Sequence, residues 1–431
     1  MSTAPSDSIR AAMQRGSTRL DLSAGLTSVP EEILEMADSL EILDLSHNQL
    51  TELPDWLPEM TKLKVLFCSH NPFQQIPRVL GRCPSLELAG FRACRIGSVP
   101  GAALPPQLRG LILTGNRLTA LPPELGRLPH LQKLMLSGNR LTSLPKELAD
   151  APALELLRLA ANDFASFPEW LWELPSLAWL AVGGNPCTAT TTSIAKAPAL
   201  IPWDHLEIGS ILGEGASGVI HEAVWQDPGG EGPAPVAVKL FKGSMTSDGL
   251  PSSEMAASLA SGGHPHLIGA LGRITGHPRS VEGLVMRLMN PAWQPLAGPP
   301  SLASCTRDIY APGIQFTAPQ AQRLIRSLAA AAMHLHDQRL LHGDFYAHNV
   351  LHQPDGHASL GDFGAASPYP PGPEGAIQRI EVRAFGILAS EILERCPETD
   401  QQPAEWAAQL SQCTCSPVSA RPLFSGITSG F

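Results

Sequence analysis

The first half of the chain repeats one pattern of apolar and polar positions. Each repeat begins with LxxLxL, continues in most copies through an asparagine, and reaches an aliphatic residue followed by proline. Alternate side chains of a strand point to opposite faces, so the pattern predicts one short strand per repeat with its leucines in a shared core. The leading leucines stand 23 residues apart, with one step of 22, at Leu40, Leu63, Leu86, Leu108, Leu131, Leu154 and Leu177.

A polar residue is expected to turn the chain after each strand. The side-chain amide of the recurring asparagine can satisfy backbone groups of the turn and of the neighbouring coil, and Cys94 replaces it once. The form LxxLxLxxNxLxxLP resembles a leucine-rich repeat over residues 18–187, with RLDLSAGLTSVP as a degenerate first unit. The resemblance implies an α/β solenoid with a curved parallel sheet over residues 18–190, after an N-terminal segment of residues 1–17. One repeat cannot bury its own apolar face, so the repeats must stack.

The concave face of this solenoid is predicted to be unusually apolar. Outward-pointing positions of the predicted strands include Phe67, Ile112, Met135 and, in a neighbouring row, Trp179. Exposed apolar surface of this kind often marks a partner site, so a protein substrate or regulator is expected to bind there. The alternative is that these side chains cover one another or the following domain.

The period ends before residues 191–203, a Thr-, Ala- and Pro-rich stretch that is expected to be a linker. A second domain follows over residues 204–431. Its motif ILGEGASGVIHEAVW places three glycines between apolar flanks, as in a strand–turn–strand whose backbone approaches a phosphate closely. VAVKLFK comes next. Farther along stand the helical segment APQAQRLIRSLAAAAMHLHD and then HGDFYAHN and GDFG, separated by the spacing of a β-hairpin.

The order of these motifs resembles a protein kinase, of a bacterial-looking type with an HGD catalytic loop. The whole chain therefore resembles a leucine-rich-repeat protein kinase. The resemblance implies an α+β domain of two lobes, the first ending at about residue 289 and the second covering residues 290–431. Lys239 would hold the α- and β-phosphates of ATP, paired with Glu254 or, in reserve, with Glu282. The implied nucleotide-binding positions are Leu212, Gly213, Gly215, Gly218, Ile220, Ala237, Lys239, Arg287 and Met289.

The resemblance also implies the chemistry of the catalytic loop. Asp344 would receive the proton of the substrate hydroxyl, so the implied catalytic residues are Asp344, Lys239 and Glu254. Asn349 and Asp362 would bind the metal. Mg²⁺ is the expected ion because it prefers hard oxygen ligands, with Mn²⁺ as the alternative.

Several positions depart from the family pattern. Gly343 stands where most protein kinases carry arginine, which removes the usual partner of a phosphorylated activation loop. Tyr346 replaces the lysine of serine/threonine kinases, and His348 stands at the place of the tyrosine-kinase arginine. Substrate specificity is therefore open, and a protonated His348 is a candidate for the missing positive contact. The segment after Gly364 is short, and Glu381 replaces the aspartate that braces the loop, so a rearranged brace is expected.

Composition narrows the possibilities further. A chain of 431 residues exceeds one ordinary core, and 43% hydrophobic and 16% charged residues with a net charge of -10 are typical of a soluble globular protein. The sequence has no basic stripe for nucleic acid. It also has no apolar run of about 18 residues that could span a membrane, and no apolar leader, which predicts a cytoplasmic protein.

These observations predict an ATP-dependent protein kinase that phosphorylates protein hydroxyls, serine or threonine in the first place, with partners recruited by the repeats. A first alternative is a repeat scaffold with a pseudokinase. A second is a small-molecule phosphotransferase, because aminoglycoside and choline kinases share the HGD form. A pair between Arg421 and Glu374, as in protein kinases, would favour the protein kinase fold over the small-molecule type.

Overall fold

A computed structural model describes residues 5–189, 199–226, 229, 232–243, 245–370, 372–397 and 404–427. The chain forms two compact units. The first contains Met1–Leu177 and the short segment Ser301–Thr306, and the second contains Ala178–Pro300 and Arg307–Phe431. The division therefore falls inside the last repeat, and Ala178 onward belongs to the second unit.

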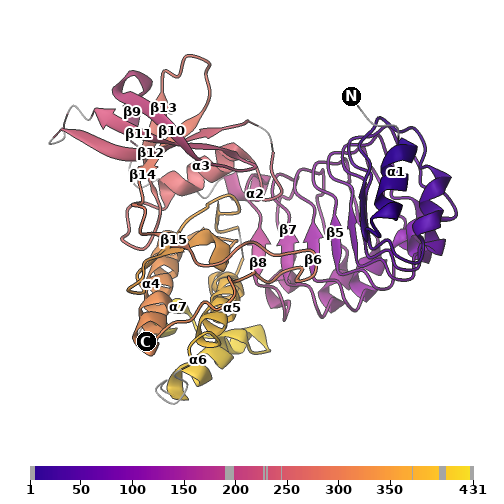
Figure 1. The fold of residues 1–431 in the computed structure, drawn as a ribbon. Helices are drawn as coiled ribbons and strands as arrows, with labels where there is room; N and C mark the ends of the chain where they lie inside the picture. The colour runs from indigo at the N-terminus through magenta and orange to yellow at the C-terminus, as the bar shows by residue number, and fades with distance from the viewer. Residues whose placement is uncertain are drawn as a thin grey trace. The chain divides into compact units, whose positions relative to one another are not determined.

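A parallel sheet with one strand per repeat runs through the solenoid (Figure 1). The middle residue of each strand, such as Leu43 or Leu66, is fully buried, as the LxxLxL pattern predicts. The predicted fold class of this half is confirmed. The strands follow in chain order as β1 Arg19–Asp21, β2 Ile42–Asp44, β3 Val65–Phe67, β4 Leu88–Gly90, β5 Gly110–Ile112, β6 Lys133–Met135, β7 Leu156–Arg158 and β8 Trp179–Ala181.

Short 3-10 helices return the chain between strands, and most begin directly after the proline of the repeat. The proline is the N-cap residue and has an extended backbone, with φ −61° and ψ 134° at Pro30, and its missing N–H costs the helix no hydrogen bond there. Helix α1 (Pro5–Gln14) precedes the first strand and buries Ile9 and Ala12. The 3-10 helices are Glu31–Met36, Leu57–Glu59, Arg78–Arg82, Gly101–Ala103, Pro123–Arg127, Lys146–Asp150 and Glu169–Glu173, and the short α2 spans Pro186–Ala189.

The recurring asparagines form a buried ladder of hydrogen bonds, as predicted. The Asn139 amide nitrogen donates to the carbonyl of Leu136 in its own turn at 2.8 Å and to that of Leu113 in the preceding repeat at 3.0 Å. Its oxygen accepts from the Leu118 backbone N–H at 3.0 Å. Cys94 keeps one of these bonds, from its thiol to the Cys68 carbonyl. The ladder satisfies backbone groups that each turn would otherwise leave buried and unpaired.

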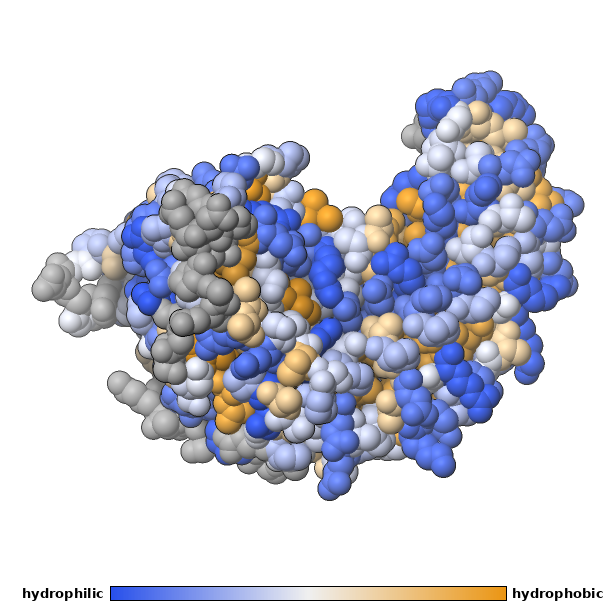
Figure 2. Space-filling view, turned by 90° about the horizontal axis from the view of Figure 1, so that it is seen from below, coloured by the Kyte–Doolittle hydropathy of each residue, from blue (hydrophilic) through white to orange (hydrophobic). Residues whose placement is uncertain are grey.

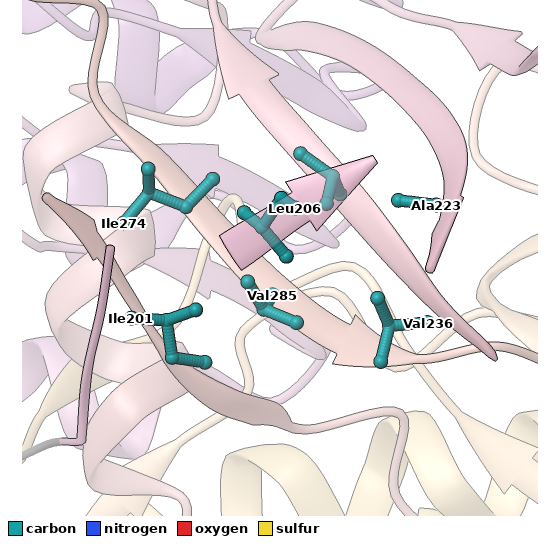
Figure 3. Packing of buried hydrophobic residues seen from close by; sticks show 7 residues of the cluster. Ile201, Leu206, Ala223, Val236, Ile274 and Val285 are labelled. Carbon is teal, nitrogen blue, oxygen red and sulfur yellow. The ribbon is translucent and has the colours of Figure 1, made fainter. Parts of the chain in front are cut away.

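The N-terminal lobe of the second unit is built on a sheet in the order β10-β11-β12-β14-β13-β9, with α3 (Pro251–Ala260) beside it. Figure 3 shows six labelled apolar side chains, one from each strand, converging on one core. The residues predicted as a linker include β9, which pairs with β13; residues 190–198 lie outside the described part of the chain. The strands are β9 Leu200–Pro202, β10 Leu206–Glu214, β11 Gly218–Gln226, β12 Pro233–Phe241, β13 Ala270–Thr275 and β14 Gly283–Arg287.

The C-terminal lobe is mainly helical. The predicted segment APQAQRLIRSLAAAAMHLHD is helix α4 (Ala318–Asp337), which starts at a capping box between Thr317 and Gln320. The predicted hairpin is formed by β17 (Val350–His352) and β18 (Ala358–Leu360). The other elements are β15 Gln294–Pro295, β16 Leu340–Leu341, β19 Ser367–Pro368, α5 Glu374–Leu393, α6 Ala404–Thr414 and α7 Phe424–Ile427. The two-lobed α+β fold is confirmed.

The surface carries mostly polar side chains. On the face drawn in Figure 2, hydrophobic residues form scattered small areas among hydrophilic ones. Within the described residues, no helix is both long enough and apolar enough to cross a bilayer.

Candidate active site

The glycine loop connects β10 and β11 and leaves room for a ligand. A Cβ atom added at Gly213 or Gly215 would meet no heavy atom within 4 Å, so neither glycine is required by the surrounding protein. At Gly218 a Cβ would lie 2.5 Å from the Leu240 carbonyl oxygen, which makes this glycine a requirement of strand pairing. Leu212 is 51% exposed, an unusual cost for a large apolar side chain. Open glycines and an exposed leucine fit a phosphate chain and an apolar base.

Lys239 on β12 and Glu254 on α3 form a buried ion pair. Both residues are less than a tenth exposed. Burial raises the pKa of Glu254, the charge of Lys239 opposes this rise, and Asp362 adds to it. A Cβ atom added at Gly364 would lie 3.1 Å from the Asp362 Oδ1 atom and 4.0 Å from the Glu254 Oε2 atom, so the two carboxylates lie near each other. The structure brings together the lysine, the glutamate and the aspartate that the sequence places far apart, whereas the reserve candidate Glu282 pairs with Arg273 at 2.8 Å.

Asp344 is held by Asn349, five residues later. The Asn349 amide nitrogen donates to the Asp344 carboxylate Oδ2 and to its backbone carbonyl, both at 2.9 Å. This pattern leaves the Asn349 amide oxygen for a cation. Asp362 has a φ of 54°, a left-handed conformation that is uncommon outside glycine and often found at functional sites. Carboxylate and amide oxygens are the donor set that Mg²⁺ prefers, so Asn349 and Asp362 fit the expected metal.

Glu381 braces the catalytic loop, although a rearranged brace was expected. Its carboxylate accepts the backbone N–H of Gly343 at 2.7 Å and that of His342 at 3.3 Å, and it contacts the His336 ring at 2.7 Å. Burial would raise the pKa of Glu381, but these hydrogen bonds and the neighbouring histidines lower it below its usual value. His336 is bonded in turn to the Tyr369 hydroxyl at 2.6 Å, so the carboxylate that holds the loop is itself held by a buried chain of side chains.

Asp308 holds His348, and neither the pair nor the role of Asp308 was predicted. Asp308 accepts the His348 backbone N–H at 3.0 Å and contacts the ring Nδ1 at 2.8 Å. Burial alone would lower the pKa of His348, but the hydrogen bond and charge of Asp308 raise it above the ordinary value. The raised pKa favours the cationic form that was predicted for the missing positive contact. Asp308 lies in an irregular segment without periodicity or motif, so no pattern in the sequence pointed to it.

Trp179 is not free for a partner. It is 1% exposed, its ring stacks on Tyr346 with centroids 4.2 Å apart and an interplanar angle of 6°, and its Nε1 donates to the Phe345 carbonyl at 3.2 Å. The alternative interpretation, in which the side chain is covered, therefore holds for this residue. Among the other predicted concave-face residues, Met135 is buried, whereas Phe67 and Ile112 are partly exposed.

The remaining predicted positions lie as follows. Ala237 is buried on β12, Ile220 is half-buried on β11, and Arg287 ends β14 with an exposed side chain. Met289 follows two residues later and is half-buried. The Glu374 side chain lies outside the described part of the structure, so the predicted pair with Arg421 stays a prediction. Arg421 donates to the backbone carbonyls of Cys415 and Arg379.

Family models match both halves of the chain. A model described as protein tyrosine and serine/threonine kinase matches residues 206–371. Models described as leucine-rich repeats match residues 38–80 and 106–164. The chain therefore carries leucine-rich repeats followed by a protein kinase domain, and the resemblance inferred from the motifs is confirmed.

Similar curated proteins match over short stretches. The chain is 34% identical over 87 residues to a leucine-rich repeat and calponin homology domain-containing protein of Drosophila melanogaster, which is 20% of this chain and 11% of that protein. It is 46% identical over 54 residues to the flightless-1 homolog of Mus musculus, covering 12% and 4% of the two chains. The chain is 29% identical over 94 residues to the leucine-rich repeat and calponin homology domain-containing protein 1 of Homo sapiens, which is 22% of this chain and 13% of that protein. The chain thus spans only a small fraction of the length of these relatives.

Proposed function

We propose that this chain is an ATP-dependent protein kinase that phosphorylates protein hydroxyl groups, serine or threonine in the first place, and that its repeats recruit the substrate or a regulator. The observation that carries the proposal is the assembled arrangement of charged groups. Lys239 and Glu254 are paired and buried next to Asp362, while Asn349 fixes Asp344 at two points. If Lys239 were an ordinary surface lysine and Asp344 a solvated loop aspartate, neither the buried ion pair nor the two hydrogen bonds from Asn349 would be expected.

Each residue then has a physical task. Leu212 and Ile220 offer apolar contact to a base, and the open glycines let the backbone N–H groups approach phosphates. Lys239 keeps its charge directed because Glu254 holds it, and that charge stabilises phosphate oxygens as a leaving group departs. When bound between Asn349 and Asp362, Mg²⁺ would neutralise further phosphate charge.

Asp344 is the residue placed to accept the proton of an attacking hydroxyl. Its carboxylate is oriented by Asn349, and the preceding backbone is fixed by Glu381. General-base catalysis of this type contributes about 10²–10⁴-fold to a rate. Tyr346, where serine/threonine kinases have a lysine, favours a second candidate, a scaffold that binds ATP without transferring phosphate.

The test is phosphate transfer from labelled ATP to a generic protein substrate and to the chain itself, with Mg²⁺ or Mn²⁺. We expect wild type to be active and Asp344→Asn and Lys239→Met to lose at least about a hundredfold. The matched controls Asp163→Asn and Lys146→Met change exposed residues of the solenoid and should keep full activity.

The outcomes separate the candidates. Equal labelling by wild type and Asp344→Asn would refute the proposed enzyme. Metal-dependent ATP binding with no transfer in any variant would establish the scaffold instead. Transfer to an aminoglycoside or choline, but not to protein, would show a small-molecule phosphotransferase.

A further inference from the structure

The segment Ser301–Thr306 follows the N-terminal lobe in the chain, yet it belongs to the compact unit of the solenoid. The Thr306 hydroxyl donates to the Glu155 carboxylate at 2.5 Å, and Arg109 donates to the Ala303 carbonyl at 3.2 Å. Thr306 is 1% and Cys305 3% exposed. The repeats that carry Arg109 and Glu155 therefore already hold an occupant, and that occupant is a piece of the same chain.

The occupant has a defined shape and chemistry. Within it, the Cys305 backbone N–H donates to the Ser301 carbonyl at 3.0 Å and the Thr306 N–H to the Ser304 carbonyl at 2.7 Å. Its side chains are uncharged and, except for Leu302, small. Burial raises the pKa of the Cys305 thiol and keeps it protonated, although the charges of Lys133 and Arg109 oppose this rise. A carboxylate that accepts a hydroxyl and a guanidinium that binds a carbonyl suit a short segment of this kind.

The next two residues of the chain contact the catalytic loop of the second unit. The Arg307 guanidinium lies 5.2 Å from the centroid of the Trp179 ring, which stacks on Tyr346. Asp308, whose side chain is 1% exposed, binds both the backbone and the ring of His348. Only one residue, Arg307, thus separates the Thr306 hydroxyl, which binds the solenoid, from the Asp308 carboxylate, which positions the catalytic loop.

We propose that Thr306–Asp308 couples the solenoid to the catalytic loop, with Arg109 and Glu155 forming a binding site whose built-in ligand is Ser301–Thr306. A partner that presents a turn with a small hydroxyl side chain, like that of Ser301–Thr306, would displace this ligand. Displacement frees Thr306, and Arg307 and Asp308 then lose their fixed positions. Both are positioning residues, since they act through Trp179 and His348. The effect on catalysis rests on the proposed function, whereas the effect on the loop itself does not.

The first measurement tests the binding site in the full-length chain. Thr306→Val removes the hydroxyl and keeps the shape, and the matched control Thr119→Val alters an exposed threonine of the solenoid. Alkylation of Cys305, followed by mass spectrometry, should become at least about tenfold faster in Thr306→Val and stay unchanged in the control. Cys68, which is fully buried in the solenoid, reports on global unfolding and should stay protected. An unchanged rate at Cys305 would overturn the proposed site.

A synthetic peptide tests the kind of partner. A peptide with the sequence of residues 299–308, with serine in place of cysteine, should accelerate alkylation of Cys305 in the wild-type chain. The same peptide with valine in place of its threonine should act far more weakly. Equal action by both peptides, or none by either, would refute a site that recognises a hydroxyl.

The second measurement tests the coupling without requiring activity. Amide hydrogen exchange in residues 342–350 should become about tenfold faster in Thr306→Val and in Asp308→Asn, and the double variant should show no further increase, because both changes break one linkage. Phosphate transfer should fall in kcat with little change in the KM for ATP. Exposed Cys305 with unchanged exchange would refute the coupling. Faster exchange in a chain that transfers no phosphate would support the coupling and refute the kinase.

Discussion

Gly343 offers the most direct test of how the catalytic loop is packed. It stands where most protein kinases have arginine, and two observations explain the glycine. Its φ is 74°, a left-handed conformation that costs other residues roughly 1–2 kcal/mol. A Cβ atom there would lie 2.5 Å from the Leu180 carbonyl oxygen and 2.8 Å from that of Ala365, well inside ordinary contact. Leu180 belongs to β8, so the last repeat strand fills the space of a side chain.

The expected effect of Gly343→Ala combines both terms. The left-handed conformation contributes about 1 kcal/mol, and overpacking against backbone atoms adds about 1–3 kcal/mol. A loss of about 3 kcal/mol corresponds to a fall in melting temperature of roughly 6–12 °C for a domain of this size. Because Gly343 donates to Glu381, a shift of the loop should also misplace Asp344 and lower kcat. Gly343→Arg, which restores the family residue, should be worse and not better.

Gly313→Ala is the matched control, because Gly313 has a φ of 77° and no atom within 4 Å of an added Cβ. It carries the backbone cost alone, about 1 kcal/mol or roughly 2–4 °C. Thermal unfolding of the wild type, Gly343→Ala and Gly313→Ala, with and without ATP and Mg²⁺, measures the difference in melting temperature between the two variants. If Gly343→Ala is no more destabilising than Gly313→Ala, the close approach of Leu180 is wrong. An active, stable Gly343→Arg variant would refute the same argument independently.

Two further predictions concern the solenoid and the pH dependence. Asn139→Ala leaves the Leu118 N–H buried without its acceptor, while the Leu113 and Leu136 carbonyls each keep a second amide donor, from Asn116 and Asn162. We therefore expect a loss of about 1–3 kcal/mol in urea unfolding, and a change below about 0.5 kcal/mol would contradict the ladder. Burial raises the pKa of Glu391 from 4.5 to about 7, against the opposing hydrogen bond from Tyr310. The stability from this group is therefore present below pH 4.5 and lost as the pH rises through about 7. Glu391→Gln should be nearly neutral at pH 5 and stabilising by up to roughly 3 kcal/mol at pH 8; equal unfolding midpoints at pH 8 would refute the raised pKa.

The sequence predicted the parts of the fold that follow from local patterns. The same leucine and asparagine positions recur about every 23 residues in the solenoid. The burial of the leucines and the hydrogen bonds of the asparagines could therefore both be predicted. Helix α4 has the bounds of the segment that was predicted to be helical, and the structure adds the capping box of Thr317 and Gln320 at its start. The partnership of Lys239 with Glu254 came from the order of motifs, and the structure forms the pair.

Contacts between distant segments could not be predicted, because no local pattern encodes them. Trp179 has the sequence position of an outward-facing concave residue, and only the tertiary structure shows that it stacks on Tyr346. Asp308 stands in a segment with neither periodicity nor motif. Its role depends on a contact with His348, which lies 40 residues later in the chain. The position of the Glu381 carboxylate also depends on a tertiary contact, because it is bonded to His336, 45 residues earlier in the chain.

Two departures from the family pattern, Gly343 and Tyr346, share one structural cause. The family arginine and lysine are replaced by Gly343 and Tyr346, and each replacement alone suggests that a function has been lost. In the structure, the carbonyl of Leu180 lies where a side chain at position 343 would begin, and Trp179 covers the residue at position 346. A Cβ atom added at Gly183, just after β8, would lie 3.4 Å from the Ala366 carbonyl oxygen and 3.5 Å from the Ser367 Cβ atom, both in the short activation segment. The altered loop residues are thus complementary to the last repeat strand, which explains why the second compact unit begins at Ala178 and not at the end of the repeats.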